Sequence, residues 1–485
     1  MLAYYRQEKM ITEAGANAYL WIALLTLGMN IVSQTAAFPL QICLIIFGVV
    51  KADIKLLPGL YITLLDAAYF SFTSAVGILK FRLGIPLSVL NVFLIVMFLN
   101  TVWGIMQNWF DKKSLQFLPF WASMIIPALV IARRGQLDGV ASNWQTPLIY
   151  IMNPALYFWG IRVGRTWDEG KDYFIKSFCA IFAVQLVFEI LRLYSPGCQF
   201  QNHIIPFAFG FILVFMNSSI FWKIIGGFAI AISVYAVMFG NIEANVQMYG
   251  LSEDTAVVST FTRLFVMLIG ASLVLTLCKM LRGHVLKVFP WAMLILCSIV
   301  FSYAVIRAGT TNQNEVIRTM SDSKHTGMLA RFEMKLIGDR GAVWNSAVRE
   351  ELFQKPLVFK RLRDKEIVDS RTGLVITKMA PHNQFLTLVC RMGWWLGLGM
   401  ALFIWWMHTR EFNMACYIDY DRLTLIALIA PSAAIFVAVG LTGQHIFTQM
   451  WHASSMASMT FPGILYGAVI ERLRRGRFVD WQWRF

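Results

Sequence analysis

Long hydrophobic segments follow one another along most of the chain, separated by short polar stretches. The hydrocarbon core of a bilayer is about 30 Å thick and requires about 20 apolar residues in a helix. We therefore expect an all-α, polytopic transmembrane bundle with about 12–14 spans. The predicted spans are 18–35, 37–51, 56–79, 86–106, 117–133, 147–163, 174–193, 203–219, 220–239, 258–281, 288–308, 384–407, 421–440 and 445–470. The stretch 203–239 has a second possible division around Asn217–Ser219.

One long polar segment, 309–382, interrupts this pattern and divides the chain. Residues 1–308 are predicted to hold about 11 spans, 309–383 a large loop outside the membrane, and 384–470 about three further spans. Residues 471–485 form a basic tail. Four arginines lie within seven residues directly after the last span. Because arginine and lysine collect on the cytoplasmic side, the tail is predicted to lie in the cytoplasm.

Counting spans backwards from this tail predicts the side on which every other segment lies. Both termini are expected in the cytoplasm and 309–382 outside it. The segments 111–113, 162–176 and 408–421 are also expected on the cytoplasmic side. Two basic pairs fall on the outer side, Lys80/Arg82 and Arg133/Arg134. Either one span is miscounted or these cations serve an anionic ligand at the outer face.

Composition supports a membrane protein and narrows the possible ligands. The chain is 58% hydrophobic and 14% charged, whereas soluble domains carry about 25% charged residues. The net charge of +15 indicates either basic cytoplasmic loops or a binding site for a phosphate-bearing ligand. We expect no nucleic-acid partner. The seven cysteines show no CxxC or zinc spacing, and no nucleotide-binding glycine motif is present.

The long loop carries thirteen lysines and arginines against nine acidic residues. Outward loops are usually poor in lysine and arginine, so this excess favours an anionic ligand. Residues 332–353 have helical periodicity and are predicted to form an interfacial helix, with its apolar stripe in lipid or against the bundle. Arg340 lies at the border of that stripe, one turn before Trp344. It is interpreted either as a snorkelling anchor or as a phosphate ligand.

The carboxyl end of the loop contains a titratable side chain at a turn. Pro381 precedes His382 and disfavours helical geometry before it. An imidazole there can accept a proton at physiological pH, although a structural role is the alternative. Asn383 is predicted to cap the following helix. Arg263 and His445 are further candidates expected at the outer face.

Two motifs in this region resemble a known family. The run Pro381-His-Asn-Gln-Phe-Leu386, with glycines following at 393 and 397, is similar to the His-Asn-x-aromatic-Leu signature of the O-antigen ligase and polymerase superfamily. Arg340-Gly-Ala-Val-Trp344 resembles that family's Arg-x-x-x-Trp helix, and Thr262-Arg263 its short Ser/Thr-Arg motif. The resemblance covers about 331–400 and also fits the order of spans, outward loop and signature.

This resemblance implies a C-type-like inverting glycosyltransferase of the bacterial inner membrane. The implied donor is an oligosaccharide on undecaprenyl pyrophosphate, used at the periplasmic face without metal or cofactor. On that model His382 is the general base, and Arg340 and Arg263 hold the pyrophosphate. Apart from the family model, this chain offers Asn383, Trp344, His445, Arg361 and Arg363 as candidates for supporting roles. The acceptor is a second lipid-linked glycan or lipid A-core, and a chain-length regulator is a further possible partner.

The chain also departs from the family in informative places. A basic run containing Arg361 and Arg363 stands where relatives often have a glycine-rich stretch. Many ligases carry a second histidine two residues before the signature histidine, and here that residue is Ala380. This difference favours a polymerase over a ligase. The alternative from another class is a lipid-linked oligosaccharide flippase, which would require related halves and charged residues lining a cavity at the midplane.

Overall fold

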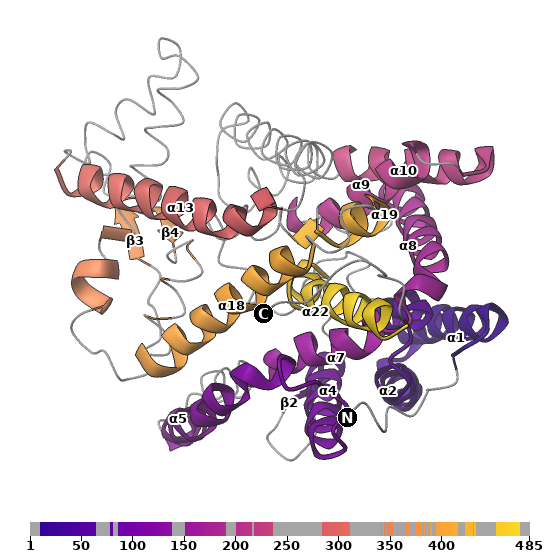
Figure 1. Ribbon diagram of the computed structural model, residues 1–485, viewed down its shortest axis with the longest axis horizontal. Coiled ribbons are helices and arrows are strands. Elements are labelled where there is room, and N and C mark those ends of the chain that lie inside the picture. Colours follow the sequence, from indigo (N-terminus) through magenta and orange to yellow (C-terminus); the bar gives the residue numbers. More distant parts are fainter. Residues whose placement is uncertain are drawn as a thin grey trace, which may run out of the picture.

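The computed structural model describes residues 10–64, 78–80, 86–137, 151–190, 200–215, 218–235, 284–310, 341, 344–345, 347–352, 365–368, 375–379, 383, 386, 389, 394–415, 422–429, 431–432 and 453–475. These residues are predominantly helical, which confirms the predicted all-α bundle (Figure 1). The α-helices are α1 Glu13–Val32, α2 Gln34–Lys51, α3 Leu57–Thr63, α4 Val89–Met106, α5 Leu118–Leu137, α7 Pro154–Gly164, α8 Trp167–Ile190, α9 Phe200–Phe215, α10 Ile220–Tyr235, α13 His284–Thr310, α18 Gly399–Ala415, α19 Arg422–Thr424 and α22 Ala453–Arg474. Short 3-10 and π segments are η1 Ile54–Leu56, η3 Ser114–Phe117, η6 Ala347–Leu352, η7 Trp394–Leu398 and η8 Leu425–Ile429.

Polar side chains at the first helix ends explain where these helices begin. The Thr12 hydroxyl accepts a hydrogen bond from the amide of Gly15, and Ser33 caps α2 in the same way. The buried Asp53 carboxylate accepts hydrogen bonds from the amides of Ile11 and Lys55, at 2.9 and 3.0 Å. This turn therefore fixes the start of α1 against the end of α2.

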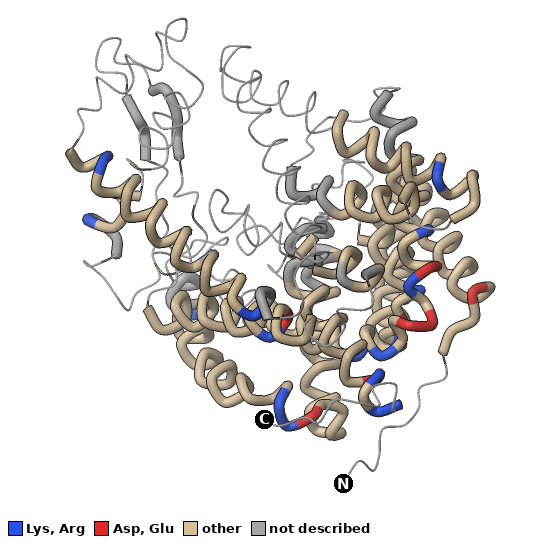
Figure 2. The backbone as a smooth tube through the Cα atoms, turned by 45° about the horizontal axis from the view of Figure 1, so that its top comes forward, with Lys and Arg blue, Asp and Glu red and all other residues tan. Residues whose placement is uncertain are grey.

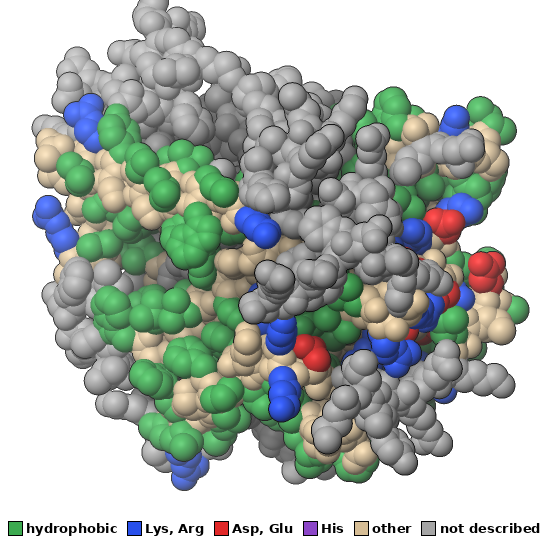
Figure 3. Space-filling view, viewed as in Figure 1, with side chains coloured by type: hydrophobic (Ala, Val, Ile, Leu, Met, Phe, Trp, Pro, Cys, Tyr) green, Lys and Arg blue, Asp and Glu red, His purple; other side chains and the backbone are tan. Residues whose placement is uncertain are grey.

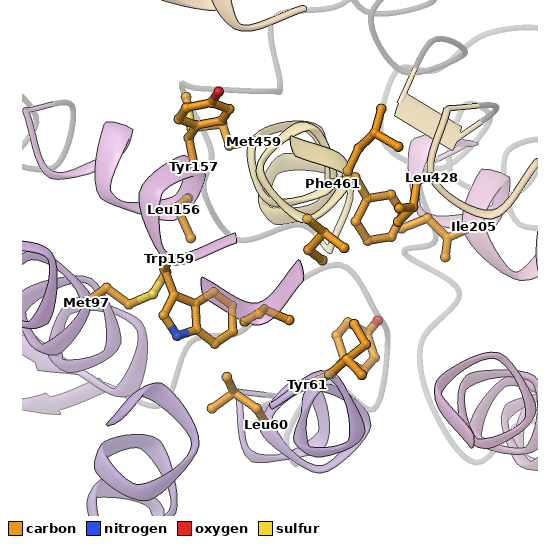
Figure 4. Close-up of a cluster of buried hydrophobic side chains, with 14 of the residues drawn as sticks. Leu60, Tyr61, Met97, Leu156, Tyr157, Trp159, Ile205, Leu428, Met459 and Phe461 are labelled. Carbon is orange, nitrogen blue, oxygen red and sulfur yellow. The ribbon is translucent and has the colours of Figure 1, made fainter. Parts of the chain in front are cut away.

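The core is organised around the crossing of α7 and α22, which lie together at the centre of Figure 1. Aromatic and aliphatic side chains from both helices extend to the surrounding elements, as Figure 4 shows. Phe461 on α22 lies with Leu428 and Ile205, whereas Trp159 on α7 lies with Met97. All five side chains are buried in one hydrophobic cluster. Helices before and after the long polar segment thus share a single core.

Glycines allow α7 and α22 to approach at backbone distance. A Cβ atom at Gly164 would lie 2.1 Å from the carbonyl oxygen of Ile464, and one at Gly467 would lie 2.1 Å from that of Ile161. Gly160 and Gly463 meet in the same crossing. Each helix therefore presents a small-xxx-small motif to the other, a pattern typical of helix packing in membranes. The same device recurs between α9 and α10, where Gly210 faces Gly226.

The structure contains two antiparallel β-hairpins, whereas the sequence predicted only helices and loops. Strands β1 Ile78–Lys80 and β2 Pro86–Ser88 pair with Leu79 opposite Leu87, so the predicted spans 56–79 and 86–106 are wrong at these ends. A proline is unfavourable inside a helix but tolerated at the first position of a strand, and α4 begins only at Val89. Within the long loop, β3 Lys365–Val368 pairs with β4 Val375–Met379, with a bulge between Ile367 and Val368.

Two segments that were expected to be polar cytoplasmic loops are largely helical. The break between α7 and α8 is only two residues long, and Arg162 is buried. Its guanidinium donates hydrogen bonds to Asn100 and to the Val50 carbonyl and lies 4.2 Å from the Trp109 ring centroid. These protein groups provide the hydrogen bonds that water would otherwise make with the charged side chain. Likewise, α18 continues to Ala415 rather than ending near residue 407. Arg133 and Arg134 lie inside α5, beyond the predicted start of a loop.

Other predicted boundaries agree with the structure. The predicted span at 288–308 lies within α13, and the predicted spans 203–219 and 220–239 correspond to α9 and α10, of which α10 begins at Ile220. Within the predicted 332–353 helix, Trp344 and Asn345 are helical and Ala347–Leu352 is a π-helix. The predicted span 258–281 lies outside the described residues.

The outer surface of the bundle is strongly apolar. Within the described part of the chain, one helix, Lys287–Thr310, is long and apolar enough to cross a bilayer by length and composition. Shorter apolar helices are Thr35–Lys51, Ile54–Thr63, Val92–Met106, Ser114–Val130, Ile205–Phe215 and Ile220–Tyr235. Large apolar side chains are exposed on most of these helices, and Figure 3 shows them spread over one face. Such a surface is compatible with membrane association.

Candidate functional site

Asn383 marks the beginning of the helical stretch that follows the candidate base in sequence. Its side-chain oxygen accepts a hydrogen bond from the amide of Leu386 at 3.1 Å, and Leu386 is helical. An acceptor three residues before the bonded amide is the geometry of a helix N-cap. The predicted cap is therefore confirmed, and the residue directly before it in sequence is His382.

Trp344 belongs to a small buried cluster on α13. The cluster consists of Ala304, Trp344, Ala347 and Leu386, with partly buried Phe301, Val305 and Val348 around it. Trp344 is 1% exposed, and its ring centroid lies 5.2 Å from that of Phe301. Of the two alternatives for this stripe, Trp344 packs against the bundle rather than facing lipid.

Two further contacts fix the Trp344 segment to α13. The side-chain amide of Asn345 donates to the Val305 carbonyl at 2.9 Å. A Cβ atom at Gly341 would lie 2.5 Å from the Ala304 carbonyl oxygen, so only a glycine allows this approach without a shift. The segment is thus held by apolar contacts, by a hydrogen bond and by close backbone packing.

The cluster brings two motifs together that are 42 residues apart in sequence. Trp344 ends the Arg-x-x-x-Trp motif, and Leu386 ends the His-Asn-x-aromatic-Leu run. Both side chains belong to one buried cluster that also contains Ala304 of α13. The sequence alone does not reveal this arrangement, because it depends on a third element that neither motif contains. This shared position defines the candidate site.

Other predicted site residues lie outside the described part of the chain: His382, Arg340, Arg263, His445, Arg361 and Arg363. Near the cluster, Arg307 and Arg349 are exposed cations. Arg349 has a terminal nitrogen 3.3 Å from where a Cβ atom at Gly309 would be. Guanidinium groups suit phosphate because they donate paired, charge-assisted hydrogen bonds. Among the described residues, no group of three or more potential metal-ligating His, Cys, Asp or Glu side chains occurs.

A second polar region lies where the ends of several helices meet, and Figure 2 shows charged residues of both signs gathered there. We call it the charged end and define it by Asp111, Asp168, Arg410, Tyr466 and Arg472. The Tyr466 hydroxyl donates to Asp111 at 2.8 Å and accepts from Arg410 at 2.9 Å. The guanidinium of Arg410 also lies 4.7 Å from the Tyr466 ring centroid and donates to the Lys113 carbonyl. The 111–113 turn, α18 and α22 are thereby joined.

An ion pair joins α8 and α22 at the charged end. Arg472 donates to both carboxylate oxygens of Asp168, with an Nε to Oδ2 distance of 2.8 Å. Next to it, Arg475 donates to Glu169, and this hydrogen bond raises the pKa of the Arg475 guanidinium. The sequence predicts that these segments lie on one side of a membrane but does not predict their pairing, since the partners are 304 and 306 residues apart.

A buried polar group on α18 also escaped prediction. The Nδ1 atom of His408 is 2.9 Å from a carboxylate oxygen of Glu411, and the Ser432 hydroxyl donates to the same oxygen at 2.8 Å. All three residues are buried. The three-residue spacing of His408 and Glu411 is visible in the sequence and could have indicated a pair on one helix face. The group fixes the 422–432 region against α18.

Comparison with protein-family models, with curated proteins and with solved structures gave no match to this chain. The class that the fold itself defines is a helical bundle with an apolar surface. Its functional assignment therefore rests on the residues of the candidate site.

Proposed function

We propose that the protein is an inverting glycosyltransferase of the bacterial inner membrane. It polymerises or transfers oligosaccharide units carried on undecaprenyl pyrophosphate, at the periplasmic face. The observation that supports this proposal most strongly is the packing of Trp344 and Leu386 in one cluster on α13. In the sequence, Trp344 follows Arg340 by four residues and Leu386 follows His382 by four residues.

In the proposed reaction, His382 takes the proton from the acceptor hydroxyl as that oxygen attacks the anomeric carbon. The bond between this carbon and the pyrophosphate oxygen breaks, and the pyrophosphate leaves with the bonding electrons. Arg340 and Arg263 bind the negative charge that develops on the leaving group, an effect that is usually large in catalysis. Arg361, Arg363 and His445 are supporting candidates. Neither a metal ion nor a cofactor takes part.

The proposed topology is that of a multi-pass membrane protein with both termini in the cytoplasm. Exposed apolar side chains on α1, α4, α5, α10 and α13 favour a lipid environment. The charged end contains residues from the segments that the basic tail assigns to the cytoplasm, namely 111–113, 162–176 and 408–421. Arg410 donates to the Lys113 carbonyl and Arg472 donates to Asp168, and both contacts are compatible with the proposed topology.

The proposed partners are a lipid-linked oligosaccharide donor, a glycan acceptor and the surrounding lipids. Ala380 favours a polymerase, whose acceptor is a second lipid-linked glycan, over a ligase that uses lipid A-core. A chain-length regulator would be a further partner of a polymerase. The second candidate function is a flippase for lipid-linked oligosaccharide, which would share the apolar surface but would not need a base.

Purified full-length protein supplied with lipid-linked repeat units tests the proposal. A polymerase converts these units into a ladder of longer lipid-linked glycans. A ligase gives product only when lipid A-core is added. Movement of the intact donor across vesicle membranes without any new glycosidic bond would identify a flippase and contradict the proposal.

A further inference from the structure

Helix α13 exposes most of its length as an apolar surface. Its 27 residues span about 40 Å, which exceeds the hydrocarbon thickness of a bilayer. The exposed apolar residues are Val288, Trp291, Leu294, Ile295, Leu296, Ile299, Tyr303 and Ile306. Figure 3, in the same view as Figure 1, shows apolar side chains over this helix. By contrast, Ala304 on α13 is buried by the candidate site.

Two cations lie at the end of this apolar surface. Arg307 follows Tyr303 by one helical turn and is exposed. Arg349 comes from the segment that Trp344 and Asn345 hold against α13, and it lies beside Gly309. The result is a long apolar stripe that ends in guanidinium groups. This combination complements a lipid that has an anionic phosphate head and a long hydrocarbon chain.

We propose that α13 is the docking surface for the polyprenyl chain of the donor, with Arg307 and Arg349 contacting its phosphate-bearing head. The inference rests on the proposed function, because it identifies the lipid as the donor. Continuity with the candidate site distinguishes α13 from other apolar helices. Helix α5 also exposes Leu129, Val130 and Arg133, but the segments that carry the candidate motifs pack on α13.

Photocrosslinking of the full-length protein in lipid vesicles tests this docking surface. Ile299 on α13 is replaced by benzoylphenylalanine, and Leu129 on α5 is replaced in a matched control. The two side chains are 59% and 53% exposed. The probe is radiolabelled undecaprenyl diphosphate without a glycan, in vesicles of phosphatidylethanolamine and phosphatidylglycerol. We expect labelling at position 299 well above that at position 129, with competition by unlabelled undecaprenyl diphosphate and none by added phosphatidylglycerol.

An Arg349→Gln variant tests the head-group contact. Loss of one charge-assisted hydrogen bond should lower the affinity of the crosslinking site for the probe about tenfold. Because Arg349 is exposed, thermal unfolding should not change, which separates lost binding from lost folding. An unchanged affinity in this variant would overturn the assigned head-group contact.

Four outcomes would overturn either the docking surface or the proposed function. Equal labelling at the two positions means that the chain only dissolves in the bilayer, and competition by phosphatidylglycerol means an ordinary phospholipid site. Either result overturns the inference. Transfer activity without selective labelling at position 299 also overturns it and leaves the function standing. Selective labelling without any transfer overturns the glycosyltransferase proposal instead. In that case α13 is still a binding site for polyprenyl diphosphate.

Discussion

At the residue scale, Asn383 links the candidate base to a defined helix start. Replacing Asn383 with alanine removes the hydrogen bond to the Leu386 amide and should cost about 1 kcal/mol of stability. Asn383→Ser keeps a capping oxygen and should retain most of that stability. Thermal unfolding of the purified variants measures the difference, and transfer activity should follow the same order. Equal behaviour of the alanine and serine variants would contradict the capping role.

Trp344 supplies the largest side chain of the cluster on α13. Trp344→Ala leaves a cavity beside Phe301, and we expect a loss of about 3–5 kcal/mol in local stability with a fall in transfer. Trp344→Phe keeps an aromatic ring and should be milder. Trp21→Ala is a suitable control because Trp21 is 70% exposed. Both properties are measurable on protein in detergent, and a similar loss at Trp21 would indicate a nonspecific effect.

These two residues also show what the sequence can predict at this scale. A cap depends on groups three residues apart, so the Asn383 hydrogen bond was predictable from local sequence. The burial of Trp344 depends on α13. Helical periodicity alone does not distinguish a side chain that faces lipid from one that packs against protein. Trp344 could be assigned only once α13 was placed beside it.

At the scale of helices, close glycine contacts decide how the elements pack. In α10, a Cβ atom at Gly226 would lie 2.8 Å from the Gly210 carbonyl oxygen, whereas nothing lies within 4 Å of one at Gly227. Gly226→Ala should therefore force α9 and α10 apart at a cost of about 1–3 kcal/mol. Gly227→Ala should be neutral or stabilising by up to about 1 kcal/mol, because alanine favours a helix.

The neighbouring glycines provide a matched pair in one helix with the same substitution. Thermal unfolding in detergent should separate the two variants clearly. Equal midpoints would mean that α9 and α10 do not meet at Gly210 and Gly226. The corresponding contact of α7 with α22 could have been found from the spacing of Gly160 with Gly164 and of Gly463 with Gly467.

Hydrophobic patterning predicted the existence of most helices better than their ends. The central parts of α1, α2, α9, α10 and α13 coincide with predicted spans. The ends differ where polar residues find partners inside the protein, as Arg162 does with Asn100 and Glu411 does with His408. The β3–β4 hairpin was not predicted, although Ile367, Val368 and Val375 are β-branched residues of the kind that is enriched in strands.

At the scale of the whole molecule, the charged end joins helices that are remote in sequence. Asp168→Asn weakens the pair with Arg472, whose side chain is 5% exposed. Leaving a buried guanidinium without its carboxylate should cost roughly 3 kcal/mol. Lys112→Gln is the control, because Lys112 is exposed on the turn before α5. A double-mutant cycle of Asp168→Asn with Arg472→Gln measures the coupling, and additive effects would contradict the pairing.

The sequence predicts that these polar segments lie on the same side of the membrane, but it does not predict which residues contact one another. Positive charge predicted that 111–113, 162–176 and 408–421 lie on one side. The structure brings residues from all three into the charged end. The partners themselves depend on helix rotation and tilt, which composition does not encode.

The central claim is that a single base in the candidate site drives glycosyl transfer. Purified wild-type protein and His382→Ala, each supplied with lipid-linked repeat units, test this claim most directly. The variant should retain its thermal stability and its binding of undecaprenyl diphosphate. Its transfer rate should fall by about 10²–10⁴-fold, the usual contribution of general acid–base catalysis. Transfer at the wild-type rate in His382→Ala would contradict the claim.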